Sequence, residues 1–356
     1  MDGSKLIPIL VDSGKKISLL EPGIETRTFS SFELREDHVE SFLDGNLDIL
    51  FSGDDTALSL LPVGRQVPNE FGGECDLVAI DSEGCIVIIE IKRDPKDCKA
   101  RVEAFEMQAI RYASSFALLE SPLELADQVF VPYLLRYQQD KVAGIDVHDY
   151  ARNEIDRFLR TNGCLSSFNQ KQKIILVASG FDPEAKSACA WLVKNGIDLS
   201  CIQITPLNQN NDQNFLLVER IIPPPELKDM FAKLGKRKNV RQAGNGGPSP
   251  DRIKRAKLTT TAEMIEQGLL CKGDTIIIKD KPESEAIIDD YRTVTYKNEK
   301  LSWNVWAKRM TGWSAVNIYA NTFSLRHNKT LDEIRNEYAS TIQPDLDIIA
   351  EGTPDN

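Results

Sequence analysis

The feature that most constrains the fold of this chain is a pair of apolar runs separated by a short polar turn. Residues 76–80 read Asp-Leu-Val-Ala-Ile, and residues 85–92 read Cys-Ile-Val-Ile-Ile-Glu-Ile-Lys. Runs of β-branched residues on either side of a glycine-containing turn predict a β-hairpin. The second run is apolar on both faces, as is typical of a central strand that is covered on both sides. The hairpin therefore predicts a sheet that lies between other layers of the structure.

The turn sets the register of this hairpin. If the residues after Asp81 form a three-residue loop with Gly84 in the left-handed conformation, Asp81 faces Cys85 across the ladder. Counting back along both strands then places Asp76 opposite Glu90. Cross-strand partners have Cβ atoms about 4.5–5.5 Å apart, which is close enough for two carboxylates to share one divalent cation.

Lys92 adds a third charged group at one end of this otherwise apolar strand. It lies two residues after Glu90 and therefore projects from the same face of the strand. Burying an unpaired carboxylate costs several kcal/mol, so Glu90 needs a cation or hydrogen bonds. One interpretation is a structural ion pair of Lys92 with Glu90 or Asp76, and the other is a metal site.

The surroundings of these residues favour the metal site. Asp76, Glu90 and Lys92 form the pattern Asp-x13-Glu-x-Lys, which resembles the PD-(D/E)XK nuclease superfamily. The closer similarity is to the NucS-like branch, and it rests on six pieces in the same order: Glu36-Asp-His-Val39, Gly64-Arg65, Gly72-Gly73-Glu-Cys-Asp76-Leu77, Glu83-Gly84, Glu90-Ile-Lys92-Arg93 and Gln108-x3-Tyr112. The resemblance covers about residues 31–225. It departs at Cys75, which stands where the superfamily name has Pro.

The resemblance implies a fold, an activity and a set of metal ligands. The fold is an α/β restriction-endonuclease-like core, with a mixed central sheet flanked by helices. The activity is metal-dependent hydrolysis of phosphodiester bonds in DNA, either in restriction of foreign or modified DNA or in DNA repair. Hard oxygen ligands suit Mg2+ or Mn2+, and those implied here are Asp76, Glu90, Glu36 and the carbonyl of Ile91. Lys92 would orient the attacking water or offset charge that develops in the transition state.

Further residues of the matching pieces are implied to face the site or the DNA. The resemblance gives Gln108 a place in the active site, on a helix that the apolar pattern predicts within residues 96–119. It gives Arg65 a role in positioning the DNA backbone and adds Arg93 and Tyr112 as DNA contacts. The alternative for Gln108 is that it caps the rim of the core.

The resemblance implies that one glutamate of an N-terminal helix joins the metal site, and two glutamates are candidates for this role. Residues 32–43 have a helical pattern, and Glu36 and Glu40 lie one turn apart on one face of it. In the NucS-like branch this helix has the form Glu-x-x-Leu, and its match to Glu36-Asp-His-Val39 favours Glu36, while Glu40 stays an alternative.

Changes in composition divide the chain into five parts. They are an N-terminal β extension, the nuclease domain, a flexible linker, a small α+β domain and a disordered acidic tail, at residues 1–30, 31–228, 229–257, 258–340 and 341–356. Strands alternate with helices in the nuclease domain, which predicts an α/β sandwich with a partly parallel sheet. Its later elements are expected at residues 146–159, 173–178, 183–195, 196–204 and 215–222.

The linker is basic although the chain as a whole is acidic. From Lys233 to Lys257 there are nine Lys or Arg and one acidic residue, whereas the formal net charge of the whole chain is -11. Gly, Pro, Ser and charge with few large apolar residues are typical of flexible segments. One interpretation is a tether that binds the phosphate backbone of DNA, through Lys236, Arg237, Lys238 and Arg241. The alternative is a solubilising hinge.

The small domain contains a series of short motifs. They are Leu269-Leu-x2-Gly273-Asp, Ser302-Trp-x2-Trp306-Ala, Thr311-Gly312, Asn317 and Leu331-Asp-Glu-Ile-Arg335. This series resembles the RAMA domain (restriction enzyme, adenine methylase associated), which implies contact with modified or unmodified DNA. Trp303 and Trp306 have helical spacing and are expected in the core. Trp313 is expected at the surface and, together with Asn317, is a candidate DNA contact.

The remaining composition excludes several other classes of protein. No run approaches 18 apolar residues, so neither a transmembrane helix nor a membrane partner is expected. The N-terminus lacks a basic region followed by an apolar one, so no export is expected. The seven cysteines form no Cys-x2-Cys pair and the three histidines are isolated. This argues against a zinc site or a disulfide framework and favours reduced thiols in the cytoplasm.

Assembly and alternative functions stay open at this point. A single active site cuts one strand, so double-strand cleavage would require a homodimer or two binding events. The alternatives to a nuclease are a DNA-binding module with an inactive nuclease fold and a subunit of a larger restriction complex for defence. The intact Asp76, Glu90 and Lys92 argue against an inactive fold, because a buried acid cluster is costly to keep.

Overall fold

The structure is a computed structural model and describes residues 9–11, 17–19, 24–51, 58–70, 72–94, 103–209, 213–223 and 259–342. The chain divides into two compact units. The first unit comprises Met1–Ser52, Leu58–Pro224 and the short segment Trp313–Ala315, and the second comprises the rest. No feature of the sequence indicates that three residues from the later part of the chain belong to the first unit.

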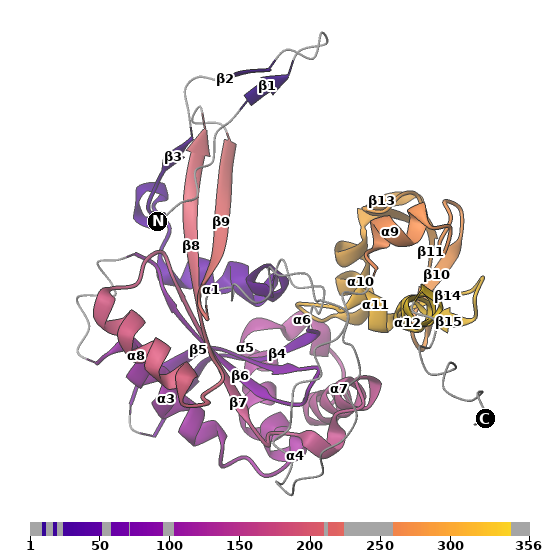
Figure 1. Ribbon diagram of the computed structural model, residues 1–356. Helices are drawn as coiled ribbons and strands as arrows, with labels where there is room; N and C mark the ends of the chain where they lie inside the picture. Colours follow the sequence, from indigo (N-terminus) through magenta and orange to yellow (C-terminus); the bar gives the residue numbers. More distant parts are fainter. Residues whose placement is uncertain are drawn as a thin grey trace, which may run out of the picture. The chain divides into compact units, whose positions relative to one another are not determined.

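A mixed β-sheet forms the centre of the first unit (Figure 1). Its strands in the described residues are β3 (Glu25–Thr26), β4 (Leu60–Pro68), β5 (Glu74–Asp81), β6 (Ile86–Lys92), β7 (Gln172–Ala178), β8 (Leu199–Gln209) and β9 (Gln213–Ile222). Their order is β3-β8-β7-β6-β5-β4, and β9 pairs with β8. β7 runs parallel to both β6 and β8, and the other pairs are antiparallel. The partly parallel sheet predicted from the sequence is thus confirmed.

Helices cover both faces of this sheet. They are η1 (Phe29–Phe32), α1 (Glu36–Asp44), η2 (Leu47–Phe51), α3 (Phe105–Phe116), α4 (Pro122–Leu125), η3 (Ala126–Phe130), α5 (Val131–Tyr137), α6 (Gln139–Val142), α7 (Val147–Thr161), η4 (Leu165–Ser167) and α8 (Pro183–Lys194). β7 contributes alternate residues to two apolar clusters, because side chains alternate between the faces of a strand. Ile175 and Val177 join the residues of α1 and η2, whereas Ile174, Leu176 and Ala178 join those of α3 and α8.

The central hairpin has the register that its turn predicts. Gly84 has a φ of 85°, in the left-handed region, and the Asp81 N–H donates to the Cys85 carbonyl at 3.0 Å. Leu77 pairs with Ile89, so the next residues along the two strands are Asp76 and Glu90. In the N-terminal β extension, β1 (Ile9–Val11) pairs antiparallel with β2 (Ile17–Leu19).

Side-chain caps fix where the later helices begin. The Asp182 carboxylate accepts from the Ala185 N–H at 2.7 Å, and Pro183 occupies the first turn of α8. Asp146 caps α7 in the same way.

The first helix differs from its prediction, because it begins at Glu36 and not at residue 32. Glu33 takes a left-handed conformation with a φ of 57° and ends a preceding 3-10 turn there.

The second unit contains a separate antiparallel sheet. Its elements are α9 (Thr261–Glu266), β10 (Thr275–Ile278), β11 (Lys281–Ile288), β12 (Thr293–Tyr296), β13 (Glu299–Ser302), α10 (Trp303–Thr311), α11 (Ile318–Asn321), β14 (Thr322–Ser324), β15 (Lys329–Thr330) and α12 (Leu331–Ile342). The strand order is β13-β12-β11-β10-β14-β15. Trp303 and Trp306 are buried, as their helical spacing predicts.

No helix in the described part of the chain has both the length and the apolar character needed to cross a membrane.

Candidate metal centre

Two buried carboxylates lie side by side at one end of the β5–β6 hairpin. Asp76 is 8% exposed, and its Oδ2 accepts a hydrogen bond from the Ile91 N–H at 2.7 Å. Glu90 is fully buried, and neither of its carboxylate oxygens has a hydrogen-bond partner among the described residues. Because a buried carboxyl group without a partner costs free energy, the fold alone gives no reason for an acid at this position.

The surroundings of both carboxyl groups disfavour their charged forms. Burial raises the pKa of Glu90 well above its usual range, and the neighbouring Asp76 raises it further. Burial also raises the pKa of Asp76, against the lowering effect of Lys92 and of the Ile91 N–H. A divalent cation between these groups would reverse both effects, since an opposite charge close by favours the carboxylate.

Lys92 ties the carboxylates to the neighbouring helix α1. Its Nζ donates to Glu36 Oε1 at 3.1 Å and to the Ile91 carbonyl at 2.8 Å, and it lies 3.9 Å from Asp76 Oδ2. Burial lowers the pKa of Lys92, but the surrounding carboxylates led by Asp76 raise it more, so the net shift is upward. The amine is therefore held as a cation at the edge of the acid cluster.

Helix α1 brings two glutamates to Asp76. Glu36, Glu40 and Asp76 each offer a carboxylate oxygen within 4.8 Å of the others. Glu40 is buried and held by Arg65 Nε at 3.4 Å and by Gln66 Nε2 at 3.2 Å, whereas the Glu36 side chain is 35% exposed. Burial raises the pKa of Glu40, and Arg65 lowers it. Both glutamates thus reach the cluster, and the choice between them stays a prediction.

Substitution of the two glutamates separates their roles. Glu40→Gln should lower the free energy of unfolding by about 1–3 kcal/mol, because it removes the charged partner of Arg65. Glu36→Gln should lower that energy less, because Glu36 is partly exposed and the new amide oxygen can still accept from Lys92. Urea unfolding of both variants in EDTA measures this difference. Equal destabilisation by both variants would contradict the structural role given to Glu40.

A buried contact fixes the far end of α1. Asp44 is buried, and both its carboxylate oxygens accept from the Tyr133 hydroxyl, at 3.0 and 2.9 Å. Burial raises the pKa of Asp44, and the Tyr133 hydroxyl lowers it. Since α5 supplies Tyr133, the position of α1 and of its two glutamates depends on packing between these helices.

Two predicted DNA contacts are engaged within the protein. Arg65 donates to the Asp37 carbonyl at 2.8 Å in addition to its pairing with Glu40, and its side chain is 12% exposed. Arg93 donates to the Leu34 carbonyl at 3.2 Å and lies 3.5 Å from Asp94. These contacts position the segments around the acid cluster, and binding of DNA by Arg65 and Arg93 stays a prediction.

Gln108 and Tyr112 form a pair on α3. Gln108 Nε2 donates to the Tyr112 hydroxyl at 3.4 Å. Tyr112 is 1% exposed, and contact of its side chain with DNA stays a prediction. The preceding turn of α3 reaches Lys92, whose Nζ lies 5.7 Å from the centre of the Phe105 ring.

Of the two glycines before β5, only Gly73 makes room for Tyr112, so the two positions give a matched pair of variants. Gly72 and Gly73 both have a φ of 86°, but only at Gly73 would a Cβ meet another atom, the Tyr112 hydroxyl oxygen at 2.6 Å. Gly72→Ala should cost about 1–2 kcal/mol from the left-handed backbone, and Gly73→Ala should cost more. Tyr112→Phe should recover part of the excess in a double-mutant cycle of urea unfolding. Equal costs at both glycines would contradict the proposed clash.

The remaining predicted DNA contacts fall into two groups. Lys236, Arg237, Lys238 and Arg241 lie outside the described residues. Trp313 is 3% exposed and meets Phe158 edge to face at a centroid distance of 4.7 Å, so its expected surface position is wrong. Asn317 caps α11 by accepting from the Tyr319 and Ala320 N–H groups.

Sequence reasoning missed the support that β4 gives to the cluster. Gln66, which donates to Glu40, itself accepts from the Tyr137 hydroxyl at 2.8 Å. Its φ of 50° is unusual for a residue within a strand. No sequence pattern indicates this conformation.

A second acidic group consists of Asp81, Glu83 and Cys85. Lys173 bridges the Asp81 and Glu83 carboxylates, so this group has the character of a structural ion pair.

Comparisons with known proteins add no identity: no family model, curated protein or solved structure matches the chain. What bears on function is the set of donors at the β5–β6 end. These are carboxylate and carbonyl oxygens with one amine beside them, and Glu90 has two oxygens without partners among the described residues. Hard oxygen donors of this kind fit Mg2+ or Mn2+ and not zinc.

Proposed function

We propose that this chain is a metal-dependent DNA endonuclease whose active site is the acid cluster of Asp76, Glu90 and α1. The observation that supports it most is Glu90, a fully buried carboxylate without a hydrogen-bond partner among the described residues. It lies next to a second buried carboxylate, Asp76, and two residues from Lys92. A divalent cation would give the buried charge a partner that the protein itself does not supply.

The residues divide the work of phosphodiester hydrolysis among them. Asp76, Glu90 and the Ile91 carbonyl would hold the ion, together with Glu36 or Glu40. When bound there, a divalent ion supplies an activated water and offsets charge on the scissile phosphate. Lys92 holds a proton and a positive charge at the edge of the cluster, where it would orient the water or stabilise the developing charge.

The proposal extends to the family and the partners of the chain. The order of pieces around Asp76, Glu90 and Lys92 supports a PD-(D/E)XK, NucS-like nuclease core for the first unit. The short motifs of the second unit support a RAMA-like domain that recognises modified or unmodified DNA. We place the activity in restriction of foreign DNA or in DNA repair, by a single chain, a homodimer or a larger defence complex.

The test is incubation of the purified full chain with modified and unmodified phage DNA, in Mg2+, in Mn2+ and in EDTA. Cutting in either metal and not in EDTA is the expected result, and a preference for one DNA would give the second unit its role. Binding of DNA without cutting would replace the proposal with a DNA-binding module. Binding of a second protein but of no DNA would replace it with a subunit of a larger complex.

A further inference from the structure

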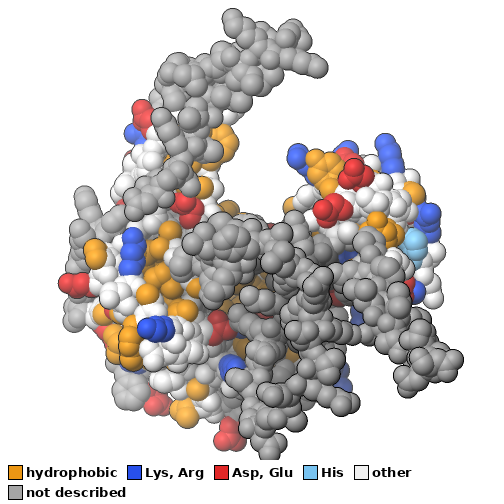
Figure 2. Space-filling view, in the orientation of Figure 1, with side chains coloured by type: hydrophobic (Ala, Val, Ile, Leu, Met, Phe, Trp, Pro, Cys, Tyr) orange, Lys and Arg blue, Asp and Glu red, His pale blue; other side chains and the backbone are white. Residues whose placement is uncertain are grey.

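A groove on the first unit lies between α3 and α8, and none of its lining residues belongs to the acid cluster. It is open to solvent, has a volume of about 690 Å³ and is lined by Met107 and Ile110 of α3 and by Trp191 and Leu192 of α8, among others. Trp191 is 64% exposed and Met107 is 51% exposed. Hydrophobic side chains gather on the face that carries these helices (Figure 2). The groove therefore gathers exposed aromatic and aliphatic side chains in one place on the surface.

One buried acid faces this groove. Glu106 lines it and is 7% exposed, yet its Oε2 has no hydrogen-bond partner among the described residues. Its chain neighbour Phe105 and the residue one turn on, Ala109, belong to the apolar cluster beneath α3 and α8. The fold thus holds a carboxyl group against apolar side chains without satisfying it, and a ligand that brings a hydrogen-bond donor would remove that cost.

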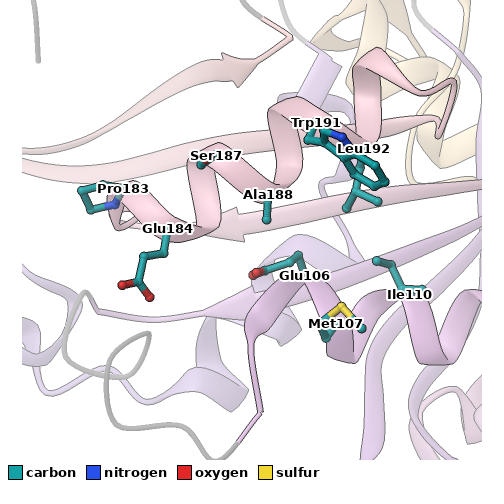
Figure 3. Close-up of a pocket in the computed structure, with 9 residues that line it drawn as sticks. All are labelled: Glu106, Met107, Ile110, Pro183, Glu184, Ser187, Ala188, Trp191 and Leu192. Atoms are coloured by element: carbon teal, nitrogen blue, oxygen red, sulfur yellow. The ribbon is translucent and has the colours of Figure 1, made fainter.

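The two ends of the groove differ in chemistry (Figure 3). The Glu106 carboxyl group points along the groove toward Glu184, so one end is acidic. Trp191 and Leu192 lie at the other end and offer aromatic and aliphatic surface. A complementary ligand therefore has a cationic head and a large apolar group beside it. Arginine and lysine also pack favourably on the face of an exposed tryptophan.

We propose that this groove is a docking site for a segment of a partner protein that presents an arginine or lysine next to a large apolar side chain. The charge complementarity of the acidic end and the exposed apolar rim argue for this partner. Two packed helices with a groove between them are also a common seat for an amphipathic peptide. Tryptophan and arginine are among the residues that contribute most at protein interfaces. The site is separate from the proposed nuclease centre and does not depend on it.

The test selects peptides from a phage-displayed random library on the full chain, and titrates the enriched peptides by calorimetry. They should share an Arg or Lys close to a large apolar residue. Glu106→Gln and Trp191→Ala should each weaken binding at least about tenfold, which corresponds to about 1.4 kcal/mol. Glu120→Gln and Leu118→Ala, which change a glutamate and a 79% exposed leucine outside the groove, should leave affinity unchanged.

Several results would overturn the proposal. Peptides that bind Glu106→Gln as tightly as the unchanged chain would show that the buried acid recognises nothing. Tryptamine carries an amine and an indole ring and serves as a small-molecule probe. If it binds only when Glu106 is present and no peptide is enriched, the groove is a small-molecule site. A dimer in sedimentation that Trp191→Ala dissociates would make a second copy of the chain the occupant. Trp191 is exposed, so Trp191→Ala keeps the test valid even if Glu106→Gln alters folding.

Discussion

Replacing Asp76 with Asn should reduce metal-dependent DNA cleavage at least about a thousandfold, which corresponds to about 4 kcal/mol of transition-state stabilisation. The substitution keeps the shape of the side chain and an oxygen that can accept from the Ile91 N–H. It removes the negative charge that would hold the cation beside Glu90. The rate of plasmid nicking under single-turnover conditions measures the effect.

A matched control lies on the same strand. Glu74 begins β5 and is exposed, so Glu74→Gln removes one negative charge near the site without touching the cluster. This variant should cut DNA at the rate of the unchanged chain, and both variants should be folded in EDTA, as far-ultraviolet circular dichroism would show. Cleavage by Asp76→Asn within about tenfold of the unchanged chain, a difference of only about 1.4 kcal/mol, would remove Asp76 from the active site.

The second large effect is a loss of stability of the metal-free chain as the pH rises. In the fold, burial raises the pKa of both Glu90 and Asp76. Above the ordinary carboxyl pKa of about 4, the folded chain therefore holds protons that the unfolded chain has lost. Stability is present at low pH and decreases with rising pH until the raised pKa values are passed. The slope is at most about 1.4 kcal/mol per pH unit for each group.

This slope is measured by urea unfolding in EDTA at a series of pH values between about pH 5 and about pH 9. Glu90→Gln should make the slope shallower, and Glu74→Gln should not change it. Adding Mg2+ should offset the decrease, because the metal binds the deprotonated carboxylates and only the folded chain offers them together. An identical slope in the unchanged chain and in Glu90→Gln would mean that Glu90 titrates normally in the fold.

The sequence predicted the hairpin and its register because both depend on local rules. A three-residue loop that ends in left-handed Gly84 leaves one pairing of the strands. That pairing brings Asp76 and Glu90 together whatever the rest of the chain does. The apolar run through β6 likewise required cover on both faces, and α1 and α3 provide it from opposite sides.

The features that escaped prediction depend on contacts between distant segments. Glu40 is held by Arg65 and Gln66, which come from β4, and no spacing on the helix reveals such partners. Trp313 follows a helix-ending glycine, which is typical of an exposed turn, yet it packs on Phe158 of the first unit. Strands β13, β14 and β15 are short and carry polar residues, so no apolar alternation indicates them.

The most direct test of the central claim is a titration of the full chain with Mn2+ at neutral pH. The electron paramagnetic resonance signal of the free ion reports how much Mn2+ is bound. The claim is that the buried Glu90 carboxylate is a cation ligand. It predicts saturable binding that Glu90→Gln weakens at least about tenfold, or about 1.4 kcal/mol, and that Glu74→Gln does not change. Equal Mn2+ binding by the unchanged chain and by Glu90→Gln, with both folded, would contradict it.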